Sequence, residues 1–251
     1  MKISRNILSL RRLTLIALVA MASVAKAQVG EYRSNFAVGF NGGYMLSNLG
    51  FVPRVSQSML GGLTGGITAR YISEKYFSTI CSVQGELNWA QAGWKEKIRD
   101  KHEQPCVNNV TGLPEEYSRT LTYVQMPFFA HLAWGKEKKG AQFFFQAGPQ
   151  VGMLISESTK TNFAYEDALN TTPNRTNTII AQDSMAVERK FDYGIAAGLG
   201  MELSIPNAGH LMLEARYYYG LGNIYGDSKR DYFAKSNISS IIVKLAWLFD
   251  L

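Results

Sequence analysis

Charged side chains spaced two residues apart are the first candidates for chemistry in this sequence. Glu214 and Arg216 share one face of a predicted strand, and Glu202 lies on the predicted strand before it. Such a group could relay protons or ions, or it could form a structural network of paired charges. Because charges removed from water are costly unless they are paired, we favour the structural interpretation.

The three histidines do not form a recognisable catalytic set. His102 lies in a predicted loop, His131 points inward near a turn, and His210 lies at another turn. Their spacing from serines and acids does not specify a nucleophile with a general base. Metal-ligand clusters, phosphate loops and dinucleotide motifs are also missing from the sequence. We therefore predict a protein that is not an enzyme and holds no metal or cofactor, with His131 as an interior hydrogen-bonding residue.

The elements that position these residues are predicted from a two-residue hydrophobic period, which is the period of a β-strand. In Phe191–Ile205 the odd positions are apolar and mostly large, whereas the even positions are small or charged. Helical periodicity is nearly absent. The same alternation marks seven further segments, namely about Asn35–Ser47, Met59–Ser73, Phe77–Ala92, Arg119–Trp134, Ala141–Ser156, Leu211–Leu221 and Ile241–Leu251.

The connections between these eight segments alternate in length. Three are tight and rich in turn residues: Glu74–Tyr76, Gly135–Gly140 and Pro206–Gly209. Four are long and polar: Asn48–Ser58, Gly93–Tyr117, Glu157–Arg189 and Gly222–Asn237. An even number of long strands, with short turns at one end and long loops at the other, is typical of a membrane barrel. We predict an all-β fold, an eight-stranded antiparallel up-and-down transmembrane β-barrel over residues 28–251, with its short turns in the periplasm.

The composition of the two strand faces decides between a membrane barrel and a soluble barrel of the lipocalin kind. One face carries large aliphatic side chains bounded by aromatic residues, as at membrane interfaces: Trp89, Trp134, Tyr193, Tyr217, Tyr219, Trp247 and Phe249. The other face is rich in small residues, which suits the narrow interior of eight strands. We predict that this interior is plugged by a polar network of Arg70, Glu86, Gln125, Glu202, Glu214, Arg216 and Lys244.

Residues 1–27 have the three parts of a secretory signal peptide. A basic region extends through Arg12, the apolar stretch Leu13–Met21 follows, and Ala25-Lys26-Ala27 forms a small-residue cleavage site. The apolar stretch is shorter than a membrane-spanning helix, so cleavage near Ala27 is favoured over a retained anchor. Five of the 26 basic residues lie in this segment, which leaves 21 against 20 acidic residues. The sequence pI of 9.2 therefore does not indicate a nucleic-acid partner.

Loop and strand residues suggest one modification, a glycosylation, and argue against a disulfide. Cys81 lies early in a predicted strand and Cys106 lies in a loop beyond its far end, so we expect no disulfide between them. Asp183-Ser184-Met185 is similar to a short O-glycosylation signal. Four Asn-x-Ser/Thr sequons, at Asn109, Asn170, Asn174 and Asn237, are interpreted only as a sign of polar loops.

The C-terminal segment resembles the signal that the barrel-assembly machinery reads during biogenesis. Lys244 and Phe249 match that pattern, Ala246 replaces its glycine, and Leu251 replaces its final aromatic residue. Other segments resemble the PorT-type outer-membrane β-barrel family of Bacteroidota over nearly the whole mature chain: VQGELNWAQAG from Val83, YVQMPFFAHLAW from Tyr123, AGPQVGMLIS from Ala147, DYGIAAGLGMEL from Asp192 and LEARYYYGLGNI from Leu213. Where Gln125 stands, the family usually has glutamate.

The resemblance implies an outer-membrane location, with contacts to outer-membrane lipid. The founding member of the family is linked to the type IX secretion system, whereas most relatives have no assigned role. The leading hypothesis is a structural or interaction protein that engages a partner through its long loops, chiefly 93–117 and 157–189. An accessory role in protein secretion across the outer membrane is the second hypothesis, and a lipid-modifying barrel enzyme is the third. The sequence does not specify the partner or the oligomeric state.

Overall fold

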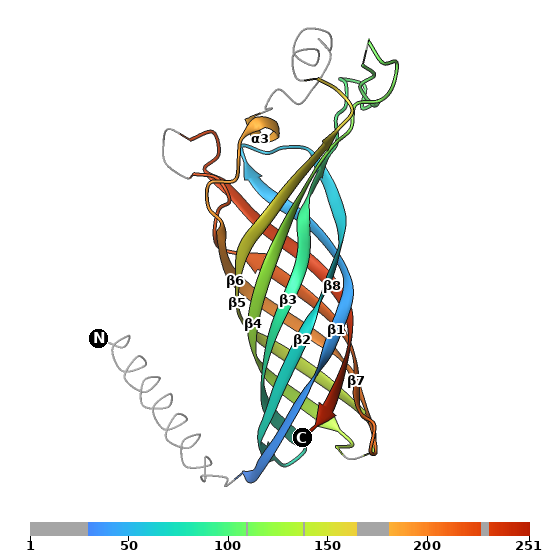
Figure 1. Cartoon of the computed structure of the whole chain (residues 1–251), viewed down its shortest axis with the longest axis vertical. Helices are drawn as coiled ribbons and strands as arrows, with labels where there is room; N and C mark the ends of the chain where they lie inside the picture. Colours follow the sequence, from blue (N-terminus) through green and yellow to red (C-terminus); the bar gives the residue numbers. More distant parts are fainter. Residues whose placement is uncertain (1–29, 109, 138, 165–180, 227–230) are drawn as a thin grey trace, which may run out of the picture.

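The computed structural model describes residues 30–108, 110–137, 139–164, 181–226 and 231–251. Within these residues, eight antiparallel strands close into a barrel in which β8 pairs with β1 (Figure 1). The predicted eight-stranded antiparallel up-and-down barrel is confirmed. The elements are β1 (Glu31–Val52), β2 (Gln57–Tyr76), β3 (Thr79–Glu96), β4 (Tyr117–Gly135), β5 (Gly140–Thr161), the short helix α3 (Ala181–Ser184), β6 (Phe191–Ile205), β7 (Gly209–Gly220) and β8 (Lys235–Asp250).

The barrel has two different ends. The turn end carries the connections 77–78, 136–139 and 206–208, together with the start of β1 and the C-terminus (Figure 1). The loop end carries the connections 53–56, 97–116, 162–190 and 221–234. The predicted signal peptide, residues 1–27, lies outside the described residues. In the part of the chain that is described, no helix is long and apolar enough to cross a membrane.

The first connection at the loop end is shorter than predicted. The sequence indicated a long loop over Asn48–Ser58, and this prediction is wrong, because β1 continues to Val52 and only residues 53–56 lie between the strands. Leu49 and Phe51 point inward and are buried, which favours continued pairing with β8 as far as Val52 opposite Lys235. The Gln57 side chain also hydrogen-bonds the Leu49 backbone.

The first connection at the turn end is displaced by a few residues. A turn was predicted over Glu74–Tyr76, but β2 extends to Tyr76 and the turn consists of Phe77 and Ser78. Phe77 was expected on the apolar face of a strand. It instead has a φ of 52° and is 80% exposed. Glu74, Lys75 and Tyr76 pair with Cys81, Ile80 and Thr79, so the ladder extends through the segment that was predicted to be the turn.

Large apolar side chains cover the outside of the barrel. Along β6 the side chains of Tyr193, Ile195 and Leu199 are 47%, 57% and 63% exposed, whereas the intervening residues are mostly buried. The predicted outward apolar face is therefore confirmed, and the aromatic residues predicted to bound it are also exposed. A barrel that dissolved in water would bury these side chains, so the surface suits hydrocarbon instead.

The loop end of the lumen contains an apolar core that the sequence pattern did not indicate. Five of its buried aromatic members come from three strands and one connection: Phe51, Trp94, Tyr117, Tyr225 and Phe233. The Phe51 and Phe233 rings lie 4.8 Å apart, and the Phe51 and Trp94 rings meet edge to face at 5.6 Å. The charged residues predicted for the interior network, among them Glu86 and Arg216, lie between this core and the turn end.

Candidate functional site: the interior polar network

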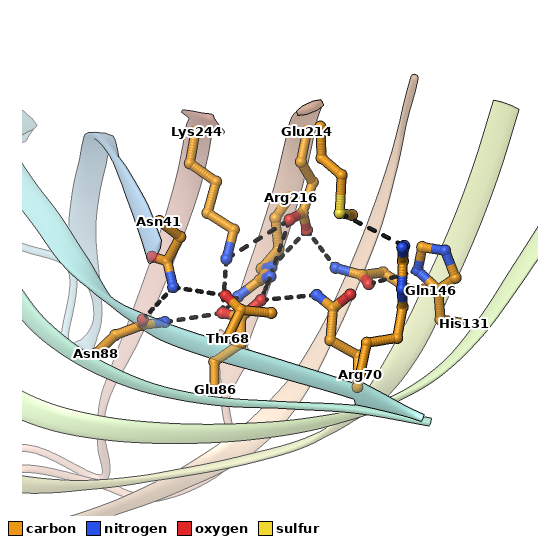
Figure 2. A network of polar contacts seen from close by, with 12 residues as sticks. Asn41, Thr68, Arg70, Glu86, Asn88, His131, Gln146, Glu214, Arg216 and Lys244 are labelled. Carbon is orange, nitrogen blue, oxygen red and sulfur yellow. Dashed lines mark hydrogen bonds and ion pairs between the residues drawn. The ribbon is translucent and has the colours of Figure 1, made fainter. Parts of the chain in front are cut away.

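Four charged side chains form the centre of the network. The Arg216 guanidinium on β7 donates two hydrogen bonds to the Glu86 carboxylate on β3, at 2.8 and 3.0 Å. It donates two more to Glu214, at 2.7 and 3.0 Å. The Lys244 ammonium on β8 lies 2.6 Å from one Glu86 oxygen and 3.6 Å from one Glu214 oxygen (Figure 2). Two cations thus balance two carboxylates.

The strand period places these side chains in the lumen. Glu214 and Arg216 are two residues apart on β7, so both point to the same side of the sheet. The Arg216 guanidinium also lies over the Phe129 ring from β4, 4.4 Å from the ring centroid. This stacking leaves the edge of the guanidinium free to contact both carboxylates.

Neutral side chains donate further hydrogen bonds to the two carboxylates. Gln84 and Asn88 each donate a hydrogen bond to Glu86, at 2.9 and 2.8 Å. Gln146 donates to Glu214 at 2.6 Å, and its own oxygen lies 3.1 Å from Nδ1 of His131 (Figure 2). A buried ion pair is stable only when its other lone pairs and protons also have partners, and this arrangement meets that condition.

A second charged cluster lies nearer the turn end. Arg70 on β2 forms a two-bond ion pair with Glu202 on β6, and one of these bonds measures 2.9 Å. Nδ1 of His210 lies 2.8 Å from Glu202 Oε1, the oxygen that also accepts the 2.9 Å bond from Arg70. Nε2 of His210 lies 3.1 Å from the Asp250 carboxylate at the end of β8. The cluster therefore joins β2, β6, β7 and the C-terminus.

Ser204, His210 and Asp250 form a hydrogen-bonded chain that the sequence spacing did not reveal. The Ser204 hydroxyl lies 3.0 Å from Nδ1 of His210, whose Nε2 faces Asp250. That order resembles a catalytic triad. However, Nδ1 also contacts the Glu202 carboxylate, and an ionised carboxylate can only accept a hydrogen bond. When Glu202 is ionised, Nδ1 must donate to it and has no lone pair to take the proton of Ser204.

The seven residues predicted for the interior network are all buried, but they do not form one group. Glu86, Glu214, Arg216 and Lys244 form the central cluster, and Arg70 with Glu202 forms the second one. Gln125 is buried on β4 and has no hydrogen bond to the six charged residues among the described contacts. The sequence did not indicate the amides that surround the carboxylates, although their inward strand positions were visible.

Arg119 closes the loop end and was also missed by the sequence analysis. Its guanidinium donates to the backbone oxygens of Gln182 and Met185, at 3.2 and 2.5 Å, and to Glu157 at 2.6 Å. The Tyr225 hydroxyl donates to the same Gln182 oxygen at 3.1 Å. Burial raises the pKa of Tyr225 well above its ordinary value, so this hydroxyl remains a donor. These contacts hold α3 across the mouth of the barrel.

The structure also places the smaller predicted sites. No disulfide joins Cys81 to Cys106. Asn237 is buried and donates to the Gly220 carbonyl oxygen at 2.8 Å, whereas Asn109, Asn170 and Asn174 lie outside the described residues. Ser184 is exposed at the end of α3. Within the described ranges, His, Cys, Asp and Glu side chains form no group that could hold a metal ion.

The residues of the predicted assembly signal separate by face. Lys244 and Ala246 are buried in the lumen, Phe249 is 47% exposed on the outer surface, and Leu251 follows the end of β8. An outward aromatic residue near the end of the last strand fits the predicted pattern. Recognition by the barrel-assembly machinery remains a prediction.

A closed barrel with an apolar exterior and a charged interior defines a class of membrane protein. The chain matches the family model described as "Outer membrane protein beta-barrel domain" over residues 26–226, and it belongs to this family. It is therefore an outer-membrane β-barrel protein. No curated protein matches the chain.

Several solved outer-membrane proteins are similar in structure, although only distantly. Ail of Yersinia pestis, solved with the heparin analogue sucrose octasulfate, is 10% identical with a TM-score of 0.35, covering 85% of this chain and 99% of its own. Neisserial surface protein A is 8% identical with a TM-score of 0.38, covering 85% of this chain and 97% of its own. OprG of Pseudomonas aeruginosa is 9% identical with a TM-score of 0.40, covering 88% of this chain and 98% of its own. Similarities at this level say nothing about the function of this chain.

Proposed function

We propose that this protein is a plugged barrel that acts as a structural or interaction protein, with its loop end outside the cell. The observation that carries the proposal is that ion pairs and aromatic side chains span the lumen. Ion pairs connect opposite walls near the middle and nearer the turn end, and the aromatic core lies above them beneath α3. The cavity beside Arg70, His131 and Glu202 measures about 20 Å³, which is room for roughly one water molecule.

The loop end provides an ordered surface for a partner. In the 97–116 connection, Val107 bridges to Pro114, and the Asn108 side chain accepts hydrogen bonds from two backbone amides, at 2.8 and 3.2 Å. These contacts hold Val107, Val110 and Leu113 in exposed positions. Apolar side chains on an ordered external loop support an interaction role.

Planar-bilayer recordings test the plugged lumen. Purified protein is expected to show no stable open level of porin size. Glu86→Ala/Arg216→Ala, which removes the central ion pair, should introduce brief openings if the network is the barrier. Large and persistent open levels in the unmodified protein would contradict the proposal.

The accessory role in secretion rests only on the resemblance to the PorT-type family. Deleting the gene and comparing secreted proteins distinguishes the two hypotheses, because unchanged secretion argues against the accessory role. Crosslinking and pull-down from native outer membranes would identify the partner that the interaction role requires. A lipid-modifying activity, the third hypothesis, would change the mass spectrum of lipid A on overexpression.

A further inference from the structure

Four basic side chains form a row on the outer surface at the loop end. Lys95 ends the outward face of β3, and Lys97, Arg99 and Lys101 continue it at two-residue spacing. Glu96 and Ile98, which alternate with the first three of these residues, point inward and are 4% and 5% exposed. The strand period therefore continues past the end of β3 as far as Arg99, and Lys101 is exposed in the turn that follows.

The upper part of the row lines a groove of about 470 Å³. Its walls are Ser56 from the first connection and Lys97, Arg99, Asp100, Lys101 and Glu103 from the second. A backbone hydrogen bond of 3.0 Å from the Lys97 amide to the Ser56 carbonyl oxygen joins the two walls. The groove is thus formed by two connections that are fixed to each other.

The two acidic residues of the groove, Asp100 and Glu103, differ in how far they offset its positive charge. One Asp100 oxygen accepts hydrogen bonds from the backbone amides of His102 and Gln104, at 2.8 and 2.9 Å, so this carboxylate is directed into its own hairpin. The Glu103 carboxylate lines the groove and opposes an anion there. Across the described residues, no carboxylate forms an ion pair with Lys97 or Lys101.

The position of the row relative to the apolar band bears on what the row could bind. Trp89 is exposed at the upper edge of the apolar band, and Lys95 lies six residues further along β3, or about 20 Å of strand. Lys95 pairs with Ser118 on β4, and Ser118 pairs with Lys160 on β5, which places a second lysine at the same height. The row therefore starts beyond the apolar band and leads away from it.

We propose that this groove binds the phosphorylated sugars of lipopolysaccharide in the protein's own membrane. A saccharide that is anchored in the bilayer and extends outward follows the same course as the cations. Lysine and arginine are the side chains that bind phosphate groups. Lys95 pairs with Glu116 at 3.4 Å, but both side chains are largely exposed and such a pair is weak, so a phosphate can displace it. The inference depends on the outward orientation of the loop end proposed above.

Binding is tested with full-length mature protein folded in detergent micelles, where membrane orientation has no influence. The probe is the delipidated, phosphorylated oligosaccharide of lipopolysaccharide, measured by calorimetry. Lys97→Glu/Lys101→Glu is expected to weaken binding by about tenfold or more, and added salt should weaken binding to the unmodified protein. The matched control is Lys136→Glu/Lys139→Glu, which makes the same charge change at exposed positions of the turn end and should leave affinity unchanged.

Three outcomes would overturn the proposal. Equal weakening by both double variants would show a general charge effect, and equal binding of the dephosphorylated saccharide would exclude phosphate recognition. Tighter binding of a heparin-derived sulfated oligosaccharide would assign the groove to a foreign glycan instead. Heat-dependent mobility in electrophoresis verifies that each variant is folded. Labelling an epitope inserted after His102 in intact cells tests orientation separately, so failure of the proposed topology is distinguishable from failure of the groove.

Discussion

Arg216 and Glu86 face each other across the lumen and are joined by two hydrogen bonds of 2.8 and 3.0 Å. Their strands, β7 and β3, are four positions apart in a ring of eight, so the pair connects opposite walls. Arg70 on β2 and Glu202 on β6 have the same relationship at a second level. We call these two pairs struts, because each joins opposite walls of the closed sheet.

Replacing Glu86 by glutamine should strongly destabilise the barrel. The change leaves Arg216 and Lys244 buried with one carboxylate between them, and breaking a buried ion pair costs about 3–5 kcal/mol. Urea unfolding in lipid vesicles measures the loss. The control Glu31→Gln, at an exposed position of β1, should change the free energy of unfolding by less than about 0.5 kcal/mol. An unfolding free energy equal to that of the unmodified protein would contradict the strut interpretation.

Arg70 and Glu202 should show strong energetic coupling. Arg70→Met and Glu202→Leu each leave one buried charge without its main partner, whereas the double variant removes both charges. The double variant should therefore lose less than the sum of the single losses, with a coupling free energy of about 1–3 kcal/mol. A double-mutant cycle on unfolding free energies measures this coupling. Purely additive losses would show that the pair contributes little.

Leu199→Arg should separate a lipid-facing surface from a water-facing one. Leu199 is 63% exposed on the outer face of β6, and arginine near the middle of a bilayer costs about 2–4 kcal/mol. Its effect is measured by unfolding in vesicles. Ser158→Arg, on the outer face of β5 above the apolar band, should change stability by less than about 0.5 kcal/mol. If both variants were equally tolerated, the apolar exterior would not face hydrocarbon.

Arg119→Met should release α3 without unfolding the barrel. The substitution removes the guanidinium contacts to Gln182, Met185 and Glu157 while keeping an apolar stem. Amide hydrogen exchange over residues 182–187 is expected to accelerate at least tenfold, while exchange in β6 and β7 stays unchanged. The exposed Arg54→Met serves as the control and should alter neither region. Unchanged exchange in this segment would show that other contacts hold the helix.

The sequence was most informative where the structure depends only on the order of residues along a single strand. The period of two along Phe191–Ile205 predicted both the bounds of β6 and its outward face, because successive strand residues point to opposite sides. The same rule failed near Pro53 and at Phe77. There, pairing with a partner strand decided how far β1 and β2 extend: Val52 lies opposite Lys235 of β8, and Tyr76 lies opposite Thr79 across a two-residue turn. Local composition carries no information about the length of a neighbouring strand.

What the sequence alone determined about this protein is therefore its strand number, its apolar exterior and the inward position of Arg70, Glu86 and Arg216. Only the tertiary structure decided which of these charges meet, because Arg216 and Glu86 are separated by 130 residues and come together through ring closure and strand register. The contact of Arg119 with α3 and the contact of His210 with Asp250 also join residues that are distant in the sequence. Two-residue alternation determines which side of the sheet a side chain faces, whereas closure of the sheet determines which residue that side chain contacts.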